Sequence, residues 1–175
     1  HQLKQGVLLA LWQRERSGKG QQVCVSLYDA AVTALANQAS NFLVAGIVAK
    51  RHGSGHPNIV PYGTVFECEH GEPVVLAIGS DRQFAAFCEL LKRTDIAENT
   101  HVCSNSQRVV FRSELNKLIS GLLAGQSRQC LLQELSSRGV PASPVNGINE
   151  VLNSRAAAPL LFDGASDTAV SKGLR

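Results

Sequence analysis

Residues 28–50, YDAAVTALANQASNFLVAGIVAK, form an apolar stretch with one acidic residue near its start and one basic residue at its end. Asp29 and Lys50 stand where a helix dipole favours negative and positive charge, so the stretch predicts one continuous helix. A helix that is apolar on most sides is buried on most sides. We therefore expect this segment to belong to an assembly larger than the 175 residues of the chain can supply.

The start of the chain predicts a helix followed by a strand. Apolar residues fall on one helical face over 3–12, and Gly18 can end that helix in a left-handed conformation. The segment 22–27, QVCVSL, has the alternation that is typical of a short strand. Because the chain begins at His1, lacks Met and enters a helical pattern almost at once, we interpret it as a fragment of a longer protein.

Beyond residue 63 the pattern changes to a strand pair followed by helices. The expected strands are 64–69 and 74–79, joined by the turn HGEP. Ser80 and Gln83 form a capping box, which predicts the start of an amphipathic helix with Phe84, Phe87, Cys88 and Leu91 on its apolar face. The same spacing recurs at Leu115, Leu118, Ile119 and Leu122. The remaining expected elements are a helix from Ser113, a helix ending at Gly139, an extended proline-containing connector at 140–145, a short helix in INEVLNSRAA, and a tail, DGASDTAVSKGLR, that is disordered or truncated.

Composition and charge argue against several functional classes. The formal net charge is +3 and the 17 basic residues are spread along the chain, which argues against a nucleic-acid-binding face. The sequence holds no apolar run long enough to span a membrane. The five cysteines are far apart without a CxxC motif, so we expect buried free thiols in a reducing compartment rather than disulfides or a zinc site.

The segment 51–63, RHGSGHPNIVPYG, admits several interpretations. A phosphate-binding loop is disfavoured, because a helix precedes the segment where a strand should end. A metal site is also disfavoured, since His52 and His56 have no carboxylate beside them in the segment. Glycines allow unusual backbone conformations, so composition alone supports a mobile lid and a plain linker between domains equally.

No residue stands out as a catalytic nucleophile. The chain has no GxSxG motif, and no cysteine has a neighbour in sequence that would activate it. Asp29 heads a predicted helix, where an aspartate is far more often a cap than a nucleophile. Composition and spacing alone indicate a soluble α/β fragment with one unusual loop.

Several segments, taken in order, resemble the family III CoA-transferases, which include carnitine CoA-transferase-like proteins and α-methylacyl-CoA racemase. The matching segments are SGKGQQVCVSLYDAAV (17–32), GSGHPNIVPY (53–62), VVLAIGSDRQFAAFCELL (74–91), NSQRVVFRSEL (105–115) and RGVPASPVNGINEVL (138–152). The resemblance extends from residue 1 to about residue 162, and the tail beyond it departs from the pattern.

This resemblance implies an enzyme that moves coenzyme A between an acyl-CoA and a small carboxylic acid, without a metal. In the family an aspartate attacks the thioester, and an enzyme–CoA thioester forms that the acceptor acid resolves. The resemblance places that aspartate upstream of residue 1, so we expect this fragment to carry no catalytic residue and to be inactive alone. Gly53, Gly55, His56 and Pro57 correspond to the family's mobile glycine-rich loop, which covers the acyl group, and this favours the lid over the linker.

Two alternatives stay open. A racemase or isomerase of the same family would act on a 2-methylacyl-CoA by proton transfer, with its acid and base residues also upstream. A non-catalytic interaction module could retain the fold without the chemistry. The nucleophile position of the upstream sequence would discriminate among the three.

The resemblance also implies an α/β fold and a domain plan. Residues 1–50 are expected to be part of a Rossmann-like large domain, 51–63 a connecting loop, 64–140 an α+β small domain, and 141–175 a return connector with a truncated tail. An interlocked homodimer is implied, which would account for the apolar segment 28–50. We expect no nucleic-acid or membrane partner, and a cytoplasmic location, or a mitochondrial or peroxisomal one in a eukaryote.

Overall fold

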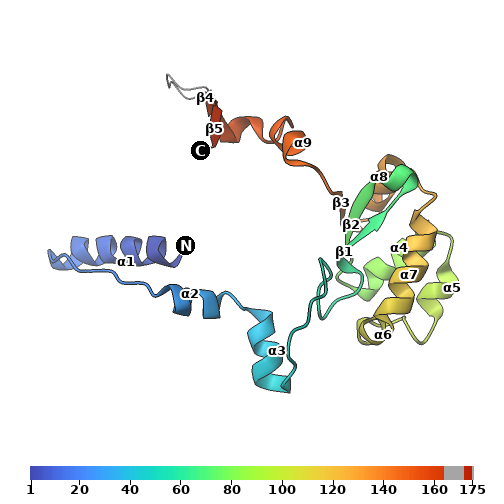
Figure 1. The fold of residues 1–175 in the computed structure, drawn as a ribbon, viewed down its shortest axis with the longest axis horizontal. Helices are drawn as coiled ribbons and strands as arrows, with labels where there is room; N and C mark the ends of the chain where they lie inside the picture. Colours follow the sequence, from blue (N-terminus) through green and yellow to red (C-terminus); the bar gives the residue numbers. More distant parts are fainter. Residues whose placement is uncertain (164–171, 175) are drawn as a thin grey trace. The chain divides into compact units, whose positions relative to one another are not determined.

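The structure is a computed structural model that describes residues 1–163 and 172–174. The chain divides into two compact units, His1–Arg51 and His52–Arg175, each with its own architecture (Figure 1). The finer division at 51–63, 64–140 and 141–175 stays a prediction.

The first unit is built from the helices α1 (Gln2–Ser17), α2 (Leu27–Thr33) and α3 (Asn37–Ala45). Gly18 has a left-handed backbone with φ 69°, and its amide donates to the Arg14 carbonyl at 2.8 Å. The predicted first helix and its glycine cap are therefore confirmed, because only a residue without a Cβ adopts this conformation at little cost.

The strand predicted at 22–27 is wrong. A strand needs a neighbouring strand to pair its backbone N–H and C=O groups, and none is present within residues 1–51, all of which the structure describes. Val23 instead lies beside α1, where a Cβ added to Gly6 would come within 2.6 Å of the Val23 Cγ1. The alternation of side chains was real, but the partner that would make it a strand is not supplied by this unit.

The continuous helix predicted over 28–50 is also wrong, because α2 and α3 are separate helices. Ala36 lies between them with φ 47° and ψ −120°, well outside the helical region. Gly46 then ends α3 in a left-handed conformation. Apolar side chains on both helices stay exposed within this chain, including Leu27 at 89% and Val44 at 87%. The expected burial therefore depends on contacts beyond these residues.

The second unit contains the antiparallel sheet β1-β2-β3, made of β1 (Tyr62–Glu67), β2 (Pro73–Ala77) and β3 (Ala142–Pro144). Phe66 pairs with Val74 across the predicted hairpin, which is confirmed, and the short 3-10 turn Glu69–Gly71 joins its strands. The connector predicted at 140–145 is extended as expected, but part of it becomes β3 and pairs with β2. Its prolines suit an edge strand, where a missing N–H faces no partner.

Helices α4 (Asp81–Leu90), α5 (Thr94–Glu98), α6 (Asn105–Val110), α7 (Arg112–Leu123) and α8 (Arg128–Ser137) lie beside the sheet (Figure 1). The sequence predicted α4, α7 and α8 but not the two short helices between α4 and α7. At the start of α4 the Ser80 hydroxyl accepts from the Gln83 amide at 3.3 Å. The Gln83 side chain accepts from the Gly79 amide at 2.9 Å, one residue earlier than in a standard capping box.

One apolar core joins these helices to the sheet. The sequence pattern correctly placed Phe84, Phe87 and Cys88 on the buried face of α4. The same spacing buries Leu115 and Ile119 on α7, because residues three and four apart share one helical face. Strand β2 and helix α8 complete the core with Val74, Leu76, Leu131 and Leu135.

The end of the chain contains α9 (Ile148–Leu152), a 3-10 turn (Ala158–Leu160) and the strand pair β4 (Leu161–Asp163) and β5 (Lys172–Leu174). The predicted short helix is confirmed in α9. The prediction of a disordered tail is wrong for Lys172–Leu174, which pair with Leu161–Asp163. The tail positions 164–171 and 175 lie outside the described residues.

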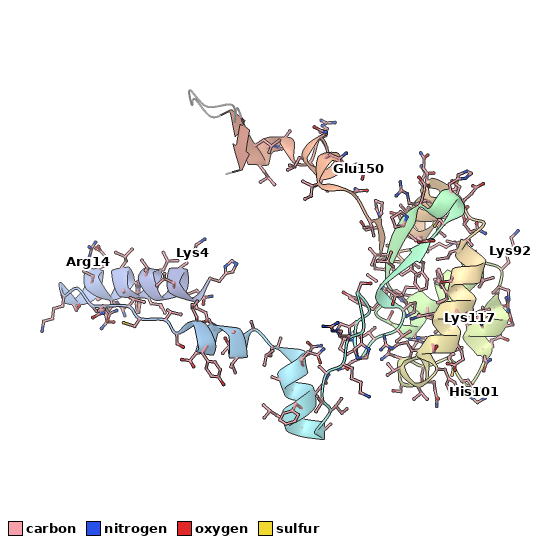
Figure 2. All side chains as sticks on the ribbon, in the orientation of Figure 1. Lys4, Arg14, Lys92, His101, Lys117 and Glu150 are labelled. Carbon is pink, nitrogen blue, oxygen red and sulfur yellow. The ribbon has the colours of Figure 1, made fainter. Side chains whose placement is uncertain are left out.

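Across the described parts of the chain, no helix combines the length and apolar character that crossing a membrane requires. The longest helix, α1, carries charged side chains along its length, among them Lys4 and Arg14 (Figure 2). Lys92 and Lys117 belong to separate parts of the second unit, after α4 and within α7 (Figure 2).

Candidate functional site

The candidate site is the glycine-rich loop that leads into β1. Its first residues, Arg51 to Ser54, are exposed, and Gly55 to Pro57 are half-buried. Val60 and Pro61 are buried against the second unit's core and are joined by a cis peptide bond. The loop therefore passes from solvent into the core over a few residues, and Gly53, Gly55, His56 and Pro57 precede its buried end.

Asn105, the first residue of α6, holds the inner part of the loop through its side-chain amide. Its Oδ1 accepts from the Val60 amide at 3.1 Å, and its Nδ2 donates to the Asn58 carbonyl at 2.8 Å. One side chain thus satisfies a backbone donor and a backbone acceptor that lie two residues apart in the loop. Backbone groups in a loop without sheet pairing need such partners when they approach the core.

Arg108 of α6 is fully buried and binds the loop and its surroundings at once. Its Nε donates to the Val60 carbonyl at 2.7 Å, and one terminal nitrogen donates to the carbonyls of Val102 and Cys103, each at 3.1 Å. The other terminal nitrogen forms an ion pair with Asp81 at 2.6 Å. A buried charge is tolerated only when it is paired and hydrogen-bonded in this way.

The plane of this guanidinium lies over the ring of Phe84, with 4.4 Å between the guanidinium carbon and the ring centroid. Asp81 and Phe84 both belong to α4, so Arg108 connects the loop to that helix as well as to α6. The planar fork of donors and the flat face of the group explain why an arginine, rather than a lysine, fits here.

Arg112, at the start of α7, binds the middle of the loop at His56 and Pro57. Its two terminal nitrogens donate to the carbonyls of His56 at 2.8 Å and Pro57 at 2.6 Å. Burial lowers the pKa of Arg112, because desolvation disfavours the charged form. The guanidinium stays charged at any physiological pH, so both hydrogen bonds are charge-assisted.

Geometry requires a glycine at position 63 and leaves little room for a side chain at position 55. Gly63 has φ 73°, and a Cβ added there would meet the Ser54 carbonyl oxygen at 2.5 Å, too close for any side chain. Gly55 lies against β1 and α7, where a Cβ would come within 3.3 Å of the Thr64 Oγ1 and 3.6 Å of an Arg112 nitrogen. Ser54 and Gly55 therefore pack closely against Gly63 and Thr64, at the start of β1.

His56 is the only ionisable side chain among the loop residues that the sequence singled out. Its amide donates to the Tyr62 carbonyl at 2.8 Å, and its Nδ1 accepts from the Asn58 amide at 3.1 Å. Its ring meets the Tyr62 ring edge-on, with 5.6 Å between centroids. These contacts fix the imidazole as part of the loop's own structure. Among residues 1–163 and 172–174, no group of His, Cys, Asp or Glu is arranged to hold a metal ion.

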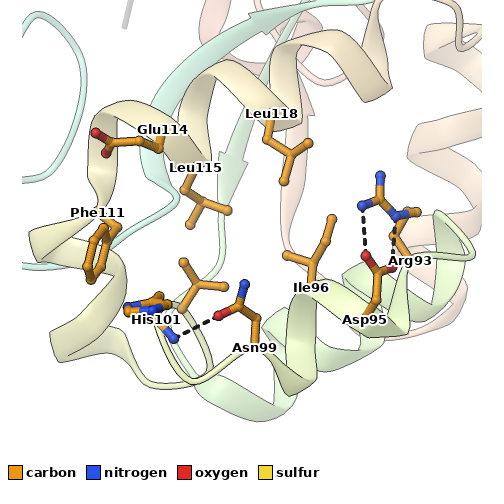
Figure 3. Close-up of a pocket in the computed structure, with 10 residues that line it drawn as sticks. Arg93, Asp95, Ile96, Asn99, His101, Phe111, Glu114, Leu115 and Leu118 are labelled. Atoms are coloured by element: carbon orange, nitrogen blue, oxygen red, sulfur yellow. Dashed lines mark hydrogen bonds and ion pairs between the residues drawn. The ribbon is translucent and has the colours of Figure 1, made fainter.

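A separate cleft of about 290 Å³ lies between α5 and α7 (Figure 3). Ile96, Leu115 and Leu118 face its interior. The polar groups at its rim already bind one another: Arg93 pairs with Asp95 at 2.7 Å, which lowers the pKa of Asp95 and raises the pKa of Arg93. The His101 ring, also at the rim, packs edge-on against the Phe111 ring, with 4.8 Å between centroids. Nothing in this arrangement activates a nucleophile.

The cysteines only partly follow the expectation of buried thiols. All five, which lie within the described residues, are free, and Cys68 and Cys88 are buried. Burial raises the pKa of Cys88 to about 11, so this thiol stays protonated and unreactive. Cys24, Cys103 and Cys130 are exposed, which corrects the expectation for them. Cys24 is exposed because the strand predicted around it does not form.

The sequence did not single out Asn105, Arg108, Arg112 or Gly63. Asn105 and Arg108 stand at i and i+3 on α6, and Arg112 is the first residue of α7, directly after the break at Phe111. The signal was present in NSQRVVFRSEL, where charged and amide residues occupy positions at which an amphipathic helix would carry apolar ones. A helix-spacing pattern can flag such residues, but their partners are carbonyls about fifty positions away, which no local pattern identifies.

Known proteins resemble this chain over most of its length. Residues 1–160 match the sequence model of CoA-transferase family III. A succinate–glutarate CoA-transferase of Agrobacterium fabrum is 35% identical over 142 residues, covering 81% of this chain and 35% of that protein. The human succinyl-CoA:glutarate CoA-transferase is 31% identical over 145 residues, covering 83% of this chain and 33% of that protein.

Solved structures give the same result. A CaiB/BaiF family protein from Brucella suis is 32% identical, with a TM-score of 0.67 over 96% of this chain and 47% of the other. A Mycobacterium tuberculosis protein is 23% identical and shares the fold, with a TM-score of 0.80 over 98% of this chain and 44% of the other. The expected α/β fold of this family is thereby confirmed. The chain spans about a third of the length of the curated relatives that it matches, and it belongs to CoA-transferase family III.

Proposed function

We propose that the whole protein is a family III CoA-transferase that moves coenzyme A from an acyl-CoA to a carboxylic acid. A nucleophilic aspartate outside these 175 residues would form the aspartyl-CoA thioester. The observation that carries this proposal is the family match over residues 1–160, together with relatives that are named CoA-transferases. A carboxylate nucleophile suits the reaction, because the enzyme-bound thioester preserves the activation of the acyl group between the two half-reactions.

We further propose short dicarboxylic acids and their CoA thioesters as the substrates. The relatives at 26–35% identity are named for succinate, glutarate, oxalate, mesaconate and malate, and each of these acids carries two carboxyl groups. A second carboxylate gives an enzyme a charged handle remote from the reacting centre, and such remote binding contributes to orientation.

In this function the glycine-rich loop would cover the reacting acyl group. Gly53 and Gly55 allow the backbone to approach a bound molecule closely, and His56 and Pro57 continue the same surface. Closing such a loop excludes water, and this protects an anhydride or thioester intermediate from hydrolysis. The exposure of Arg51 to Ser54 and the burial of Val60 support a lid with a free outer part and a fixed base.

The apolar helices of the first unit support a homodimer, which we propose to be interlocked. Leu43 and Val44 of α3 are 79% and 87% exposed in this chain, and such groups gain free energy when a partner removes them from water. We place the protein in the cytoplasm, or in mitochondria or peroxisomes if the source is a eukaryote. The free thiols support a reducing compartment.

The proposal is tested by trapping the intermediate in the full-length protein. The enzyme is incubated with succinyl-CoA and hydroxylamine, and its peptides are analysed by mass spectrometry for an aspartyl hydroxamate. In parallel, glutarate is added without hydroxylamine and the formation of glutaryl-CoA is followed. A trapped aspartate and transfer to glutarate are the expected results. An enzyme that traps nothing with any acyl-CoA but exchanges the α-proton of a 2-methylacyl-CoA would be the racemase instead.

The role of the loop has its own test. Gly55→Val places a branched side chain beside Thr64 and Arg112, and we expect turnover to fall more than thermal stability. A variant with wild-type kinetics would make the loop a linker rather than a lid.

A further inference from the structure

The glycine-rich loop consists of two parts that are held very differently. In the outer part, residues 52–55, the Gly55 amide donates to the His52 carbonyl at 3.4 Å, a local turn in which residues 52–54 are exposed and Gly55 is half-buried. In the inner part, residues 56–61, side chains of α6 and α7 bind the carbonyls of His56, Pro57, Asn58 and Val60. The change from one part to the other falls at Gly55.

The three side chains that hold the inner part come from two consecutive helices, Asn105 and Arg108 from α6 and Arg112 from the start of α7, and we call them the anchoring row. Asn105 and Arg108 bind the deep end of the loop at Val60. Arg112 lies at the other end of the row and binds the loop where it emerges toward solvent. Because the contacts fall at His56, Pro57, Asn58 and Val60, the row holds the loop along its length rather than at one point.

The contact between Arg108 and the Val60 carbonyl holds the buried end of the loop in place. Arg108 is fully buried, and its remaining donors are occupied by Asp81, Val102 and Cys103. Moving the Val60 carbonyl would leave the buried Nε of Arg108 without its acceptor. An unsatisfied buried donor costs more free energy than a surface hydrogen bond contributes. The inner part of the loop is therefore fixed relative to α4, α6 and α7.

Arg112 binds the first two residues of the inner part, directly after Gly55. Its two hydrogen bonds go to successive carbonyls, those of His56 and Pro57, so they fix the direction of the backbone as well as its position. The next residue toward the amino terminus is Gly55, where a Cβ would lie 3.6 Å from the same guanidinium. Gly55 thus combines a backbone with wide conformational freedom and a fixed neighbour on its carboxyl side.

We propose that Asn105, Arg108 and Arg112 are positioning residues of the transferase, which hold residues 56–61 so that the lid moves only in residues 52–55 with Gly55 as its pivot. This inference rests on the proposed function of the loop as a lid. The anchoring row touches neither substrate nor coenzyme A in this scheme and acts only through the loop backbone. A lid whose base drifts by an ångström loses alignment with the reacting atoms, and such misplacement can lower turnover about 100-fold.

The test uses the full-length protein with Arg112→Gln. This substitution removes the positive charge and the two guanidinium nitrogens that donate to the carbonyls of His56 and Pro57. We expect kcat to fall about 10- to 100-fold while the KM for the acyl-CoA changes by less than about 3-fold, since the loss is in alignment. Arg112→Lys should recover part of kcat, because an ammonium can reach one carbonyl but not both in the planar geometry.

Arg128→Gln is the matched control. Arg128 is a part-buried arginine of the same unit, and it pairs with Glu72 at 3.1 Å away from the loop. Its substitution removes a comparable ion pair and should leave kcat and KM at their wild-type values. A fall of kcat in Arg128→Gln equal to that in Arg112→Gln would show a general loss of structure and overturn the assignment.

A second measurement does not depend on activity. Hydrogen exchange in the wild-type protein should be fast at Gly53 and Gly55 and slow at His56 and Val60, whose amides bind the Tyr62 carbonyl and the Asn105 side chain. Arg112→Gln should speed exchange at His56 about 10-fold and leave the core amides of β2 unchanged. Unchanged exchange at His56, with or without a fall in kcat, would overturn the anchoring role.

The two measurements separate this inference from the proposed function. A full-length protein that transfers no coenzyme A to any carboxylic acid would defeat the transferase proposal, and with it the role of the row in catalysis. Exchange at His56 would still decide whether Arg112 anchors the loop. Normal transfer by the wild-type protein and by Arg112→Gln alike would leave the transferase standing and overturn the positioning role.

Discussion

The two units use apolar residues in opposite ways. In the second unit Phe84, Leu115 and Leu135 are buried in a core shared by helices and a sheet. In the first unit, residues 1–51, the structure describes every residue and none is buried. The apolar content of a segment therefore does not tell whether its own chain covers it. A sheet with helices beside it can close a core, whereas short helices in sequence leave their apolar faces for other segments to cover.

The largest expected effect comes from separating the units. A protein of residues 52–175 should fold and unfold cooperatively, because its core lies within it. A peptide of residues 1–51 should be largely unstructured, since α2 and α3 are shorter than the about 12–15 residues at which an isolated helix is marginal in water, and α1, at 16 residues, buries none of its side chains. Circular dichroism and thermal melts of both pieces measure this. A cooperative transition in 1–51, or none in 52–175, would erase the contrast.

A matched pair of leucines tests the same contrast at single residues. Leu135→Ala removes a side chain that is 0% exposed, and we expect the free energy of unfolding to fall by about 2–5 kcal/mol. Leu43→Ala removes one that is 79% exposed, and the change should stay within about 0.5 kcal/mol. Urea denaturation of the 175-residue chain gives both values. A large loss in Leu43→Ala would show that the chain itself covers α3.

A pair of cysteines extends the comparison to pH. Burial raises the pKa of Cys88 from 9.0 to about 11, so the folded protein keeps a proton that the unfolded chain releases in that interval. Stability is then fully present below pH 9 and falls as the pH rises to about 11, by about 2–3 kcal/mol. Cys88→Ala should flatten this part of the pH profile of unfolding, and Cys24→Ala, at an exposed site, should not. Identical slopes in all three proteins would contradict the burial argument.

The smallest effect concerns two glycines with the same left-handed backbone. Gly63 has φ 73° and Gly46 has φ 65°, but only at Gly63 would a Cβ meet another backbone atom. We expect Gly63→Ala to lower the free energy of unfolding by about 1–2 kcal/mol more than Gly46→Ala does. Equal losses in denaturant melts would mean that the turn at Gly63 opens freely to admit a methyl group.

Local patterns in the sequence predicted elements whose causes are local. Helix α1 and its cap at Gly18, the hairpin of β1 and β2, and the start of α4 at Ser80 all depend on residues within a few positions of one another. The loop at Gly53 to Pro57 was also recognised, from its glycines and from the family resemblance. Helical spacing predicted the buried faces of α4 and α7 for the same reason.

The errors arose where a distant partner decides the outcome. Segment 22–27 alternates like a strand but has no strand to pair with in its unit, whereas residues 142–144 lack a strand pattern and pair with β2. Arg108, which no local pattern singled out, is fully buried, because Asp81 and backbone carbonyls from other segments bind it.

Residue type and spacing along the chain identified the helical faces and the glycine-rich loop, and the resemblance of several segments identified the family. The contacts that hold the loop appear only in the folded structure. Arg112 binds the carbonyls of His56 and Pro57, Asn105 binds that of Asn58, and Arg108 binds that of Val60, across about fifty positions of chain. A backbone carbonyl looks the same at every residue, so no residue letter in the loop marks it as an acceptor. Its partner is chosen by which helix face the fold brings within hydrogen-bonding distance.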